Sequence, residues 1–199
     1  DPNQEGRGFI FHNGEDANSL LAGLTVTNGY ASDGGAIYFN GSSPTIINCT
    51  LSGNTASEGG AMDVNDTISG QTLINCAITE NVAAQEAGGV LLYRSEANMQ
   101  GCTITGNSAG VRGGGICFVT NCNPIIRDCV ISGNSAGLVG GAMECRHNSS
   151  PTITGCTISG NFCSDWGGGI YSEDSSPSIA SCVVAQNTTE GRGAGICCR

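Results

Sequence analysis

Short stretches of the chain alternate between apolar and polar residues. Cys49 and Leu51 flank a threonine, and Ile37 and Phe39 flank a tyrosine. This period of two residues predicts β-strands with one buried face. Clusters of Gly, Asn, Ser and Pro separate the stretches and are typical of turns.

The alternating pattern repeats along nearly the whole chain. The stretch PTIINCTLSGN at 44–54 returns as PTITGCTISGN at 151–161. Its cysteine recurs every 26 or 27 residues, at Cys49, Cys76, Cys102, Cys129, Cys156 and Cys182. A glycine pair recurs in step, and Leu24 holds the place of the cysteine in an earlier copy. The copies indicate a repeat architecture of about seven units.

Each unit has room for three short strands and three turns, which fit one coil of a parallel β-solenoid. We therefore predict an all-β solenoid of about seven coils of 26–27 residues, with three short strands per coil. A single domain over 1–199 is expected, with a lead-in at 1–8 and stacked coils over 9–199 without evident caps. Because coils stack at the distance between strands, seven of them would form a rod roughly 34 Å long.

Stacking places like residues above like in buried columns. Four apolar columns start from Ile37, Ile46, Cys49 and Leu51 in one copy. The alignment puts Leu91 into the column of Ile37. It puts Leu92, with Asp63, Cys117 and Glu144, into the outward column beside it.

An asparagine also recurs once in every copy, just after a strand. Its positions are Asn28, Asn54, Asn81, Asn107, Asn134, Asn161 and Asn187. Stacked amides can pair N–H with carbonyl from coil to coil and with the backbone of the turn. We therefore assign these residues a structural role rather than a ligand-binding role.

Cysteine is frequent, with 12 residues in 199. The six repeated cysteines are interpreted as buried free thiols that act as small hydrophobic residues. A soft-metal site on stacked thiolates is the alternative, but no Cys-x-x-Cys supports it, and we predict no metal site. Cys117 and Cys122 flank a short loop and are a candidate disulfide pair.

The repeated motifs Gly-Gly-x-Ile, Pro-Thr-Ile-x-x-Cys and Cys-Thr-Ile-Ser-Gly-Asn resemble those of the right-handed parallel β-helix repeat family. They are similar both to the pectate-lyase-like superfamily and to repeats of polymorphic outer-membrane proteins and other bacterial surface proteins. The resemblance covers residues 9–199. It implies a right-handed coil and an extracellular or cell-surface location. The family includes polysaccharide lyases and hydrolases as well as adhesins.

Charge narrows the range of partners. The chain has 7 basic residues, all arginine, and 17 acidic residues, for a net charge of −10. This balance disfavours nucleic acid and anionic membrane surfaces. No apolar stretch approaches the ~18 residues of a membrane-spanning helix, so no membrane insertion is expected.

No catalytic residue is predicted. Asp63 and Glu144 are expected three coils apart, roughly 14 Å, which is too far for paired-carboxylate hydrolysis. The arginines Arg94, Arg127 and Arg146 lie on different copies and are expected to form no site. The turns before the glycine pairs carry an acidic edge, interpreted as a solvated face or a weak calcium site, at Asp33, Glu58, Glu86, Asp165 and Glu190. No other cofactor is expected.

Two further surfaces are candidates for contacts. Threonine and serine recur outward of the Leu51 column and could form a flat face for ice or sugar. The first and last strands of the repeat are candidates for end-to-end contact with a second copy, through Phe9, Ile10, Phe11, Ile196, Cys197 and Cys198.

The leading hypothesis is a non-catalytic extracellular or cell-surface module, structural or adhesive, that assembles with itself into a filament or with neighbouring domains of a longer surface protein. The alternative is a carbohydrate-binding or polysaccharide-degrading domain with glycans as partners. Ice binding is a minor alternative.

Overall fold

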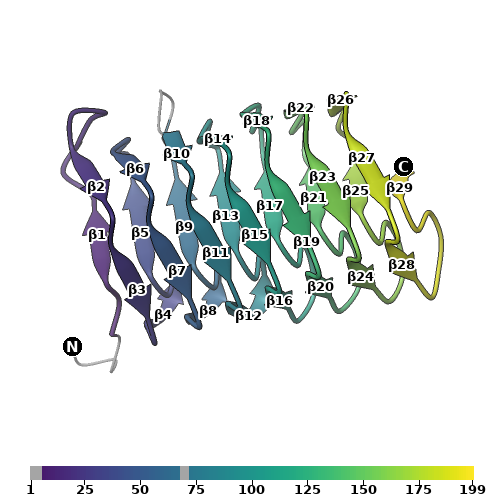
Figure 1. Cartoon of the computed structure of the whole chain (residues 1–199), viewed down its shortest axis with the longest axis horizontal. Coiled ribbons are helices and arrows are strands. Elements are labelled where there is room, and N and C mark those ends of the chain that lie inside the picture. The colour runs from purple at the N-terminus through teal and green to yellow at the C-terminus, as the bar shows by residue number, and fades with distance from the viewer. Residues whose placement is uncertain (1–5, 68–71) are drawn as a thin grey trace.

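The structure is a computed structural model that describes residues 6–67 and 72–199. The chain winds into stacked coils that form a rod, with the N- and C-terminal coils at opposite ends (Figure 1). Equivalent strands of successive coils pair in parallel, and the described strands form four sheets. Within these residues no helix could cross a membrane.

The first two sheets follow one another along each coil. Sheet A contains β1 Phe9–Phe11, β5 Ile37–Asn40, β9 Met62–Asn65, β13 Val90–Tyr93, β17 Ile116–Val119, β21 Met143–Arg146, β25 Ile170–Glu173 and β29 Ile196–Cys198. Sheet B contains β2 Leu20–Ala22, β6 Thr45–Ile47, β10 Thr72–Ile74, β14 Asn98–Gln100, β18 Ile125–Arg127, β22 Thr152–Thr154 and β26 Ser178–Ala180.

The other two sheets complete the coil. Sheet C contains β3 Thr25–Thr27, β7 Thr50–Ser52, β11 Ala77–Thr79, β15 Thr103–Thr105, β19 Val130–Ser132, β23 Thr157–Ser159 and β27 Val183–Ala185. Sheet D contains β4 Tyr30–Asp33, β8 Thr55–Glu58, β12 Val82–Glu86, β16 Ser108–Ala109, β20 Ser135–Ala136, β24 Phe162–Cys163 and β28 Thr188–Thr189.

The all-β solenoid of about seven coils is confirmed, but each coil has four strands and not three. The strand that the sequence missed belongs to sheet D. Its strands are only two to five residues long, and their buried position is usually alanine, as at Ala56 and Ala109. So small a side chain leaves little apolar signal in the sequence, although the backbone pairs as regularly as elsewhere.

The buried columns follow the repeat. Ile46 pairs with Leu73 in sheet B, and Leu51 pairs with Ile78 in sheet C. All four of these residues are completely buried. Since full burial of such a side chain stabilises the fold by about 1.5–3 kcal/mol, the stacked columns supply most of the driving force for coiling.

One column was misaligned by a single residue. Val90, and not Leu91, pairs with Ile116 and points inward. Leu91 lies in the outward column, next to Cys117, while Leu92 points inward next to Phe118. The register shifts inside the preceding strand β12 because that strand carries one extra residue between Ala83 and Glu86. A shift of one residue exchanges the two faces of a strand.

The asparagine ladder runs through the turns between sheets C and D. In Asn81, the side-chain Nδ2 donates to Leu51 O at 3.0 Å and to Asn107 Oδ1 at 2.9 Å. The Asn81 backbone N–H donates to the same Oδ1 at 3.1 Å. The same arrangement joins Asn54, Asn81, Asn107, Asn134, Asn161 and Asn187.

Asn28 does not belong to this ladder, contrary to the sequence alignment. It has a positive φ of 57° and its side chain is exposed. Gly29 takes the ladder position and donates its N–H to Asn54 Oδ1 at 2.9 Å. Asn28 instead corresponds to Gly53, the left-handed residue that precedes Asn54 in the next coil, and asparagine tolerates that conformation well.

The repeated cysteines stack one above the other. The backbone N–H of Cys102 donates to Cys129 Sγ at 3.4 Å, and Cys129 N–H donates to Cys156 Sγ at the same distance. All twelve cysteines lie within the described residues, and all are free thiols. The first and last strands of sheet A are β1 and β29, so the predicted end-to-end contact involves the two outermost strands of that sheet.

The candidate pair Cys117 and Cys122 is not a disulfide. Cys117 lies on the outer face of β17 with Ala87 and Leu91. Cys122 turns into the main core, where its thiol donates to Leu92 O at 3.3 Å. The sheet separates the two sulfur atoms because the loop after β17 carries the chain from one face to the other.

Candidate functional site

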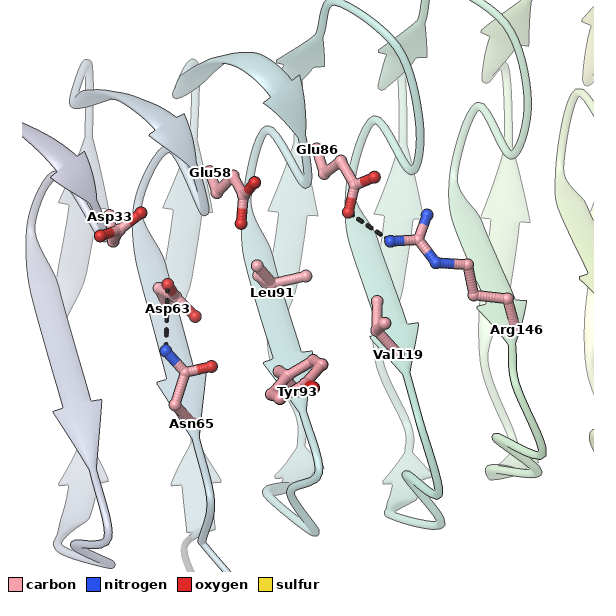
Figure 2. A pocket seen from close by; sticks show the side chains of 9 residues that line it. All are labelled: Asp33, Glu58, Asp63, Asn65, Glu86, Leu91, Tyr93, Val119 and Arg146. Atoms are coloured by element: carbon pink, nitrogen blue, oxygen red, sulfur yellow. Dashed lines mark hydrogen bonds and ion pairs between the residues drawn. The ribbon is translucent and has the colours of Figure 1, made fainter.

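A groove of about 390 Å³ lies on the outer face of sheet A, beside the turns from sheet D. Figure 2 shows its lining: carboxylates along the turns, and a mixed polar and apolar floor on the strands. The lining residues are Asp33, Glu58, Asp63, Asn65, Glu86, Leu91, Tyr93, Val119 and Arg146.

Three of the carboxylates come from equivalent positions in consecutive coils. Asp33, Glu58 and Glu86 each end a strand of sheet D, and they pair in register, Asp33 with Glu58 and Glu58 with Glu86. Successive members are therefore about one strand spacing, ~4.8 Å, apart along the rod axis. Stacked in this way, the carboxylates form an acidic row along one wall of the groove (Figure 2).

The tight glycine turn that follows Asp33 lies against Asp63 of β9 in the next coil. Gly34 has a φ of +59°, which is unfavourable for residues with a side chain. A Cβ at Gly34 would stand 2.2 Å from Ile37 O and 3.0 Å from Asp63 N. Only glycine therefore lets the turn fold tightly onto Ile37 of its own coil while it lies against the Asp63 backbone of the next coil.

Asp63 is the most unusual carboxyl in the groove. It is 2% exposed. Its Oδ2 accepts a long hydrogen bond of 3.4 Å from Asn65 Nδ2, and its Oδ1 has no partner among the described residues. Burial, followed by the charges of Asp33 and Glu58, raises the pKa of Asp63 to about 8. At neutral pH this carboxyl is therefore mostly protonated.

Glu58 is affected in the same direction. Burial raises its pKa, and repulsion from Glu86 and Asp33 adds to the effect. Within the described residues, neither Asp33 nor Glu58 takes part in an ion pair. These two carboxylates are therefore free of direct ion pairs, and the cation at this end is Arg7, whose guanidinium donates to the backbone oxygens of Asp33 and Gly34.

The other end of the groove is closed by an ion-pair chain. Arg146 of β21 contacts Glu86 at 2.5 Å and Glu144 at 3.0 Å. Arg112 contacts Glu144 from the far side at 2.8 Å. Glu144 is completely buried. Burial raises its pKa, while the two arginines oppose that rise.

The predicted acidic edge is only partly correct. Asp33, Glu58 and Glu86 come together, but Asp165 and Glu190 do not continue the row. After Glu86 the column passes through Arg112, Val139, Trp166 and Arg192. Throughout residues 6–67 and 72–199 there is no group of three or more His, Cys, Asp or Glu residues arranged to hold a metal ion.

The floor of the groove was missed by sequence reasoning. Asn65, Tyr93, Val119 and Arg146 share one outward column, two residues after the column of Asp63. Arg146 in particular was expected to join no site, yet it is part of the groove and of its ion pairs. The sequence signal for this column was its spacing: it lies two residues after the column of Asp63 on each strand of sheet A, and side chains two residues apart share a face. Asp63 and Glu144 are indeed three coils apart.

Comparisons with known proteins identify the architecture. A family model described as the right-handed beta helix region matches residues 3–112 and, in a second match, residues 69–199. The chain belongs to this family of right-handed β-helices. No curated protein matches this β-helix. Among solved structures, it is similar to the crystal structure of pectate lyase Pel9A, with 14% sequence identity and a TM-score of 0.46. That match covers 92% of the β-helix and 59% of the lyase chain.

The threonine and serine face is a second regular surface of the β-helix. Thr50 pairs with Ala77 and then Thr103 along sheet C, and Ser52 pairs with Thr79 and then Thr105. Besides Ala77, two valines interrupt the hydroxyl column: Val130 is 41% exposed and Val183 is 57% exposed. Ice or sugar binding by this face stays a prediction.

Proposed function

We propose that this β-helix is a rigid, non-catalytic binding module of an extracellular or cell-surface protein, and that it attaches to a glycan through the groove on sheet A. The observation that carries the proposal is the lining of the groove, which joins hydrogen-bonding carboxylates and an amide to an apolar floor on one rigid sheet. The resemblance of the repeats to those of bacterial surface proteins supports the location.

A sugar-binding groove needs both hydrogen-bonding groups and apolar surface. Hydroxyl groups of a sugar donate to carboxylates such as Glu58 and bond to amides such as Asn65. The ring of Tyr93 and the side chain of Leu91 offer surface to the C–H face of a sugar ring. The guanidinium of Arg94 lies 4.7 Å from the centroid of the Tyr93 ring, a cation–π contact.

Charge argues against uronic-acid polymers as the ligand. The groove carries Asp33 and Glu58 without ion-pair partners among the described residues, and the whole chain has a net charge of −10. A polyanionic glycan would be repelled by this wall. Neutral or positively charged glycans are therefore the favoured class.

The arrangement also argues against catalysis. Glycoside hydrolases place two carboxyl groups on either side of the bond to be broken. Here Asp33, Glu58 and Glu86 follow one wall, with Asp63 beneath them (Figure 2). Arg146 is bound by Glu86 and Glu144 and keeps its proton, so it cannot serve as the base of a lyase.

A binding assay tests this proposal. We expect the purified chain to bind neutral or amino oligosaccharides in a glycan array and by calorimetry, and Tyr93→Ala to abolish binding. Tyr30→Ala is the matched control, since Tyr30 is an exposed tyrosine on sheet D, away from the groove. Absence of binding to every neutral and amino glycan would refute the binding role. Release of new reducing or unsaturated ends would refute the non-catalytic role.

A further inference from the structure

At its acidic end the groove holds two carboxylates that form no ion pair, although the guanidinium of Arg7 lies nearby and donates to Asp33 O at 2.7 Å. Glu86 is neutralised by Arg146, but the next two members of the row, Glu58 and Asp33, have no ion-pair partner among the described residues. Among the residues that the structure describes, the Asp33 carboxylate accepts one hydrogen bond, from the Ser32 hydroxyl to Oδ2 at 3.1 Å. Acidic residues on a protein surface are common, so this row alone does not define a site.

Asp63 supplies an independent observation. A carboxyl that is 2% exposed normally satisfies both oxygens, yet Oδ1 has no hydrogen-bond partner in the described part of the chain. Figure 2 shows this side chain between Asp33 and Glu58, with one oxygen bonded to Asn65 and the other on the side of Leu91, toward the groove. The site thus leaves one defined, buried carboxyl oxygen without a hydrogen-bond partner.

We propose that the groove is specific for glycans with free, positively charged amino groups, of the glucosamine-oligomer class, and that an ammonium group binds between Asp63 Oδ1, Asp33 and Glu58. This inference rests on the proposed glycan-binding function and names its ligand class. An ammonium group brings three donors and one compact positive charge, which match an unpartnered oxygen flanked by two carboxylates.

The surroundings favour an amino sugar over a bare cation. The described residues offer no metal-binding group, whereas Leu91, Tyr93 and Val119 give an apolar floor beside the carboxylates. The acidic row runs along the rod axis at about one coil spacing, ~4.8 Å, so an extended oligomer meets its members in turn. The run of free carboxylates ends at Glu86, where Arg146 already occupies the cation position, and Arg112 follows in the next coil.

Binding should also release a proton. An ammonium group at Asp63 favours the ionised carboxylate, so the carboxylic acid loses its proton to the solvent and the oxygen then accepts from the ligand. The groups that face this carboxyl are Asp33, Glu58, Arg7, Tyr38, Asn65 and Leu91. Calorimetry in buffers with different ionisation enthalpies measures this proton directly.

The test compares ligands that differ only in charge. Glucosamine oligomers and N-acetylglucosamine oligomers of equal length are titrated into the chain. We expect the free-amine oligomer to bind at least about tenfold more tightly, which corresponds to ~1.4 kcal/mol. Glu58→Gln should remove most of this preference. Glu80→Gln, which makes the same change in charge at an exposed turn outside the groove, should leave it intact.

The outcomes separate this inference from the proposed function. Equal binding of the two oligomers, or tighter binding of the acetylated one, overturns the inference and leaves glycan binding standing. Absence of binding by both, with no other neutral glycan bound, overturns the proposed function. An oligolysine that binds as tightly as the glucosamine oligomer overturns specificity for a sugar. Circular dichroism of each variant shows that the coils remain folded.

Discussion

Asn107 donates from its side-chain Nδ2 to Asn134 Oδ1, one coil further along the rod, at 2.9 Å. The same Nδ2 also donates to Ile78 O at 2.9 Å, in the preceding coil. One side chain therefore joins three coils, and it does so while completely buried.

Replacement of Asn107 should be strongly destabilising. Asn107→Ala removes these bonds and leaves Asn81 without the Oδ1 that accepts from its N–H and its Nδ2. We expect a loss of about 3 kcal/mol in the free energy of unfolding, measured by urea denaturation. Asn28→Gly is the control, because Asn28 is exposed, has a positive φ and lies outside the ladder. Similar losses for both variants would contradict the ladder as the source of stability.

The glycine turn above Asp63 should tolerate no side chain. In Gly34→Ala the new Cβ would stand 2.2 Å from Ile37 O, whereas in Gly53→Ala it would meet nothing within 4 Å. Both glycines have a φ near +60°, so the two variants share the same conformational strain. We expect Gly34→Ala to cost at least about 2 kcal/mol more than Gly53→Ala in chemical denaturation. Equal costs would show that the clash is relieved elsewhere.

Asp63 should make stability depend on pH. Its carboxyl has an ordinary pKa of 3.8 in the unfolded chain and a pKa of about 8 in the folded protein. Between these values the folded state holds a proton that the unfolded state has released, so stability falls as pH rises from about 4 to about 8. Asp63→Asn removes this dependence.

Thermal unfolding at several pH values checks this prediction, with the free energy of unfolding taken from each melting curve. From about pH 5 to about pH 8, the wild type should lose more stability than Asp63→Asn, with a difference of a few kcal/mol. Glu58 and Glu144 also have raised pKa values. Both residues are present in the wild type and in the variant, so their contributions to the pH dependence cancel in the comparison. Parallel curves for wild type and variant would show that Asp63 is ionised in the folded protein.

The ion-pair chain at the closed end of the groove should matter for folding. Glu144→Ala leaves Arg146, which is 12% exposed, without one of its two carboxylate partners. Breaking a buried pair in this way costs about 3–5 kcal/mol. The exposed pair of Arg94 and Asp66 is the matched comparison, and Asp66→Ala should cost only about 0–1 kcal/mol beyond the strain of its positive φ. Urea denaturation of both variants distinguishes the two pairs.

Thiol labelling should follow burial. Cys198 is exposed and Cys182 and Cys197 are partly exposed, while the other nine cysteines are buried. Burial also raises the pKa of Cys145 and of Cys122, which lowers their thiolate fraction. We expect an alkylating reagent to modify Cys198 first in the native protein and the buried thiols only after unfolding, as followed by mass spectrometry. Native labelling of Cys117 and Cys122 would contradict their placement.

The repeat could be found from sequence because every coil buries the same positions. Ile46, Cys49 and Leu51 recur at fixed intervals, and each of their equivalents meets the same core. Sheet D escaped detection because alanine at Ala56 or Ala109 carries too little apolar signal. The misplacement of Leu91 and Asn28 came from matching residue types across a register shift in β12 and a glycine at Gly29.

The groove could be predicted only in part. Its acidic row was visible as Asp33, Glu58 and Glu86, but Tyr93 and Arg146 were not connected with it. Arg146 reaches Glu86 from two coils away, a contact across 60 residues of sequence. No local pattern encodes such a pair, because the two residues meet only after the coils have stacked.

The sequence by itself determined the period, the parallel stacking and the buried columns of this protein, because alternation and repetition indicate which side chains are buried. The tertiary structure decided which outward residues face one another, how many strands share a coil, and where charge is left unpaired. These depend on turn geometry and on the register shift in β12, which change the outer face of the rod while its core stays the same.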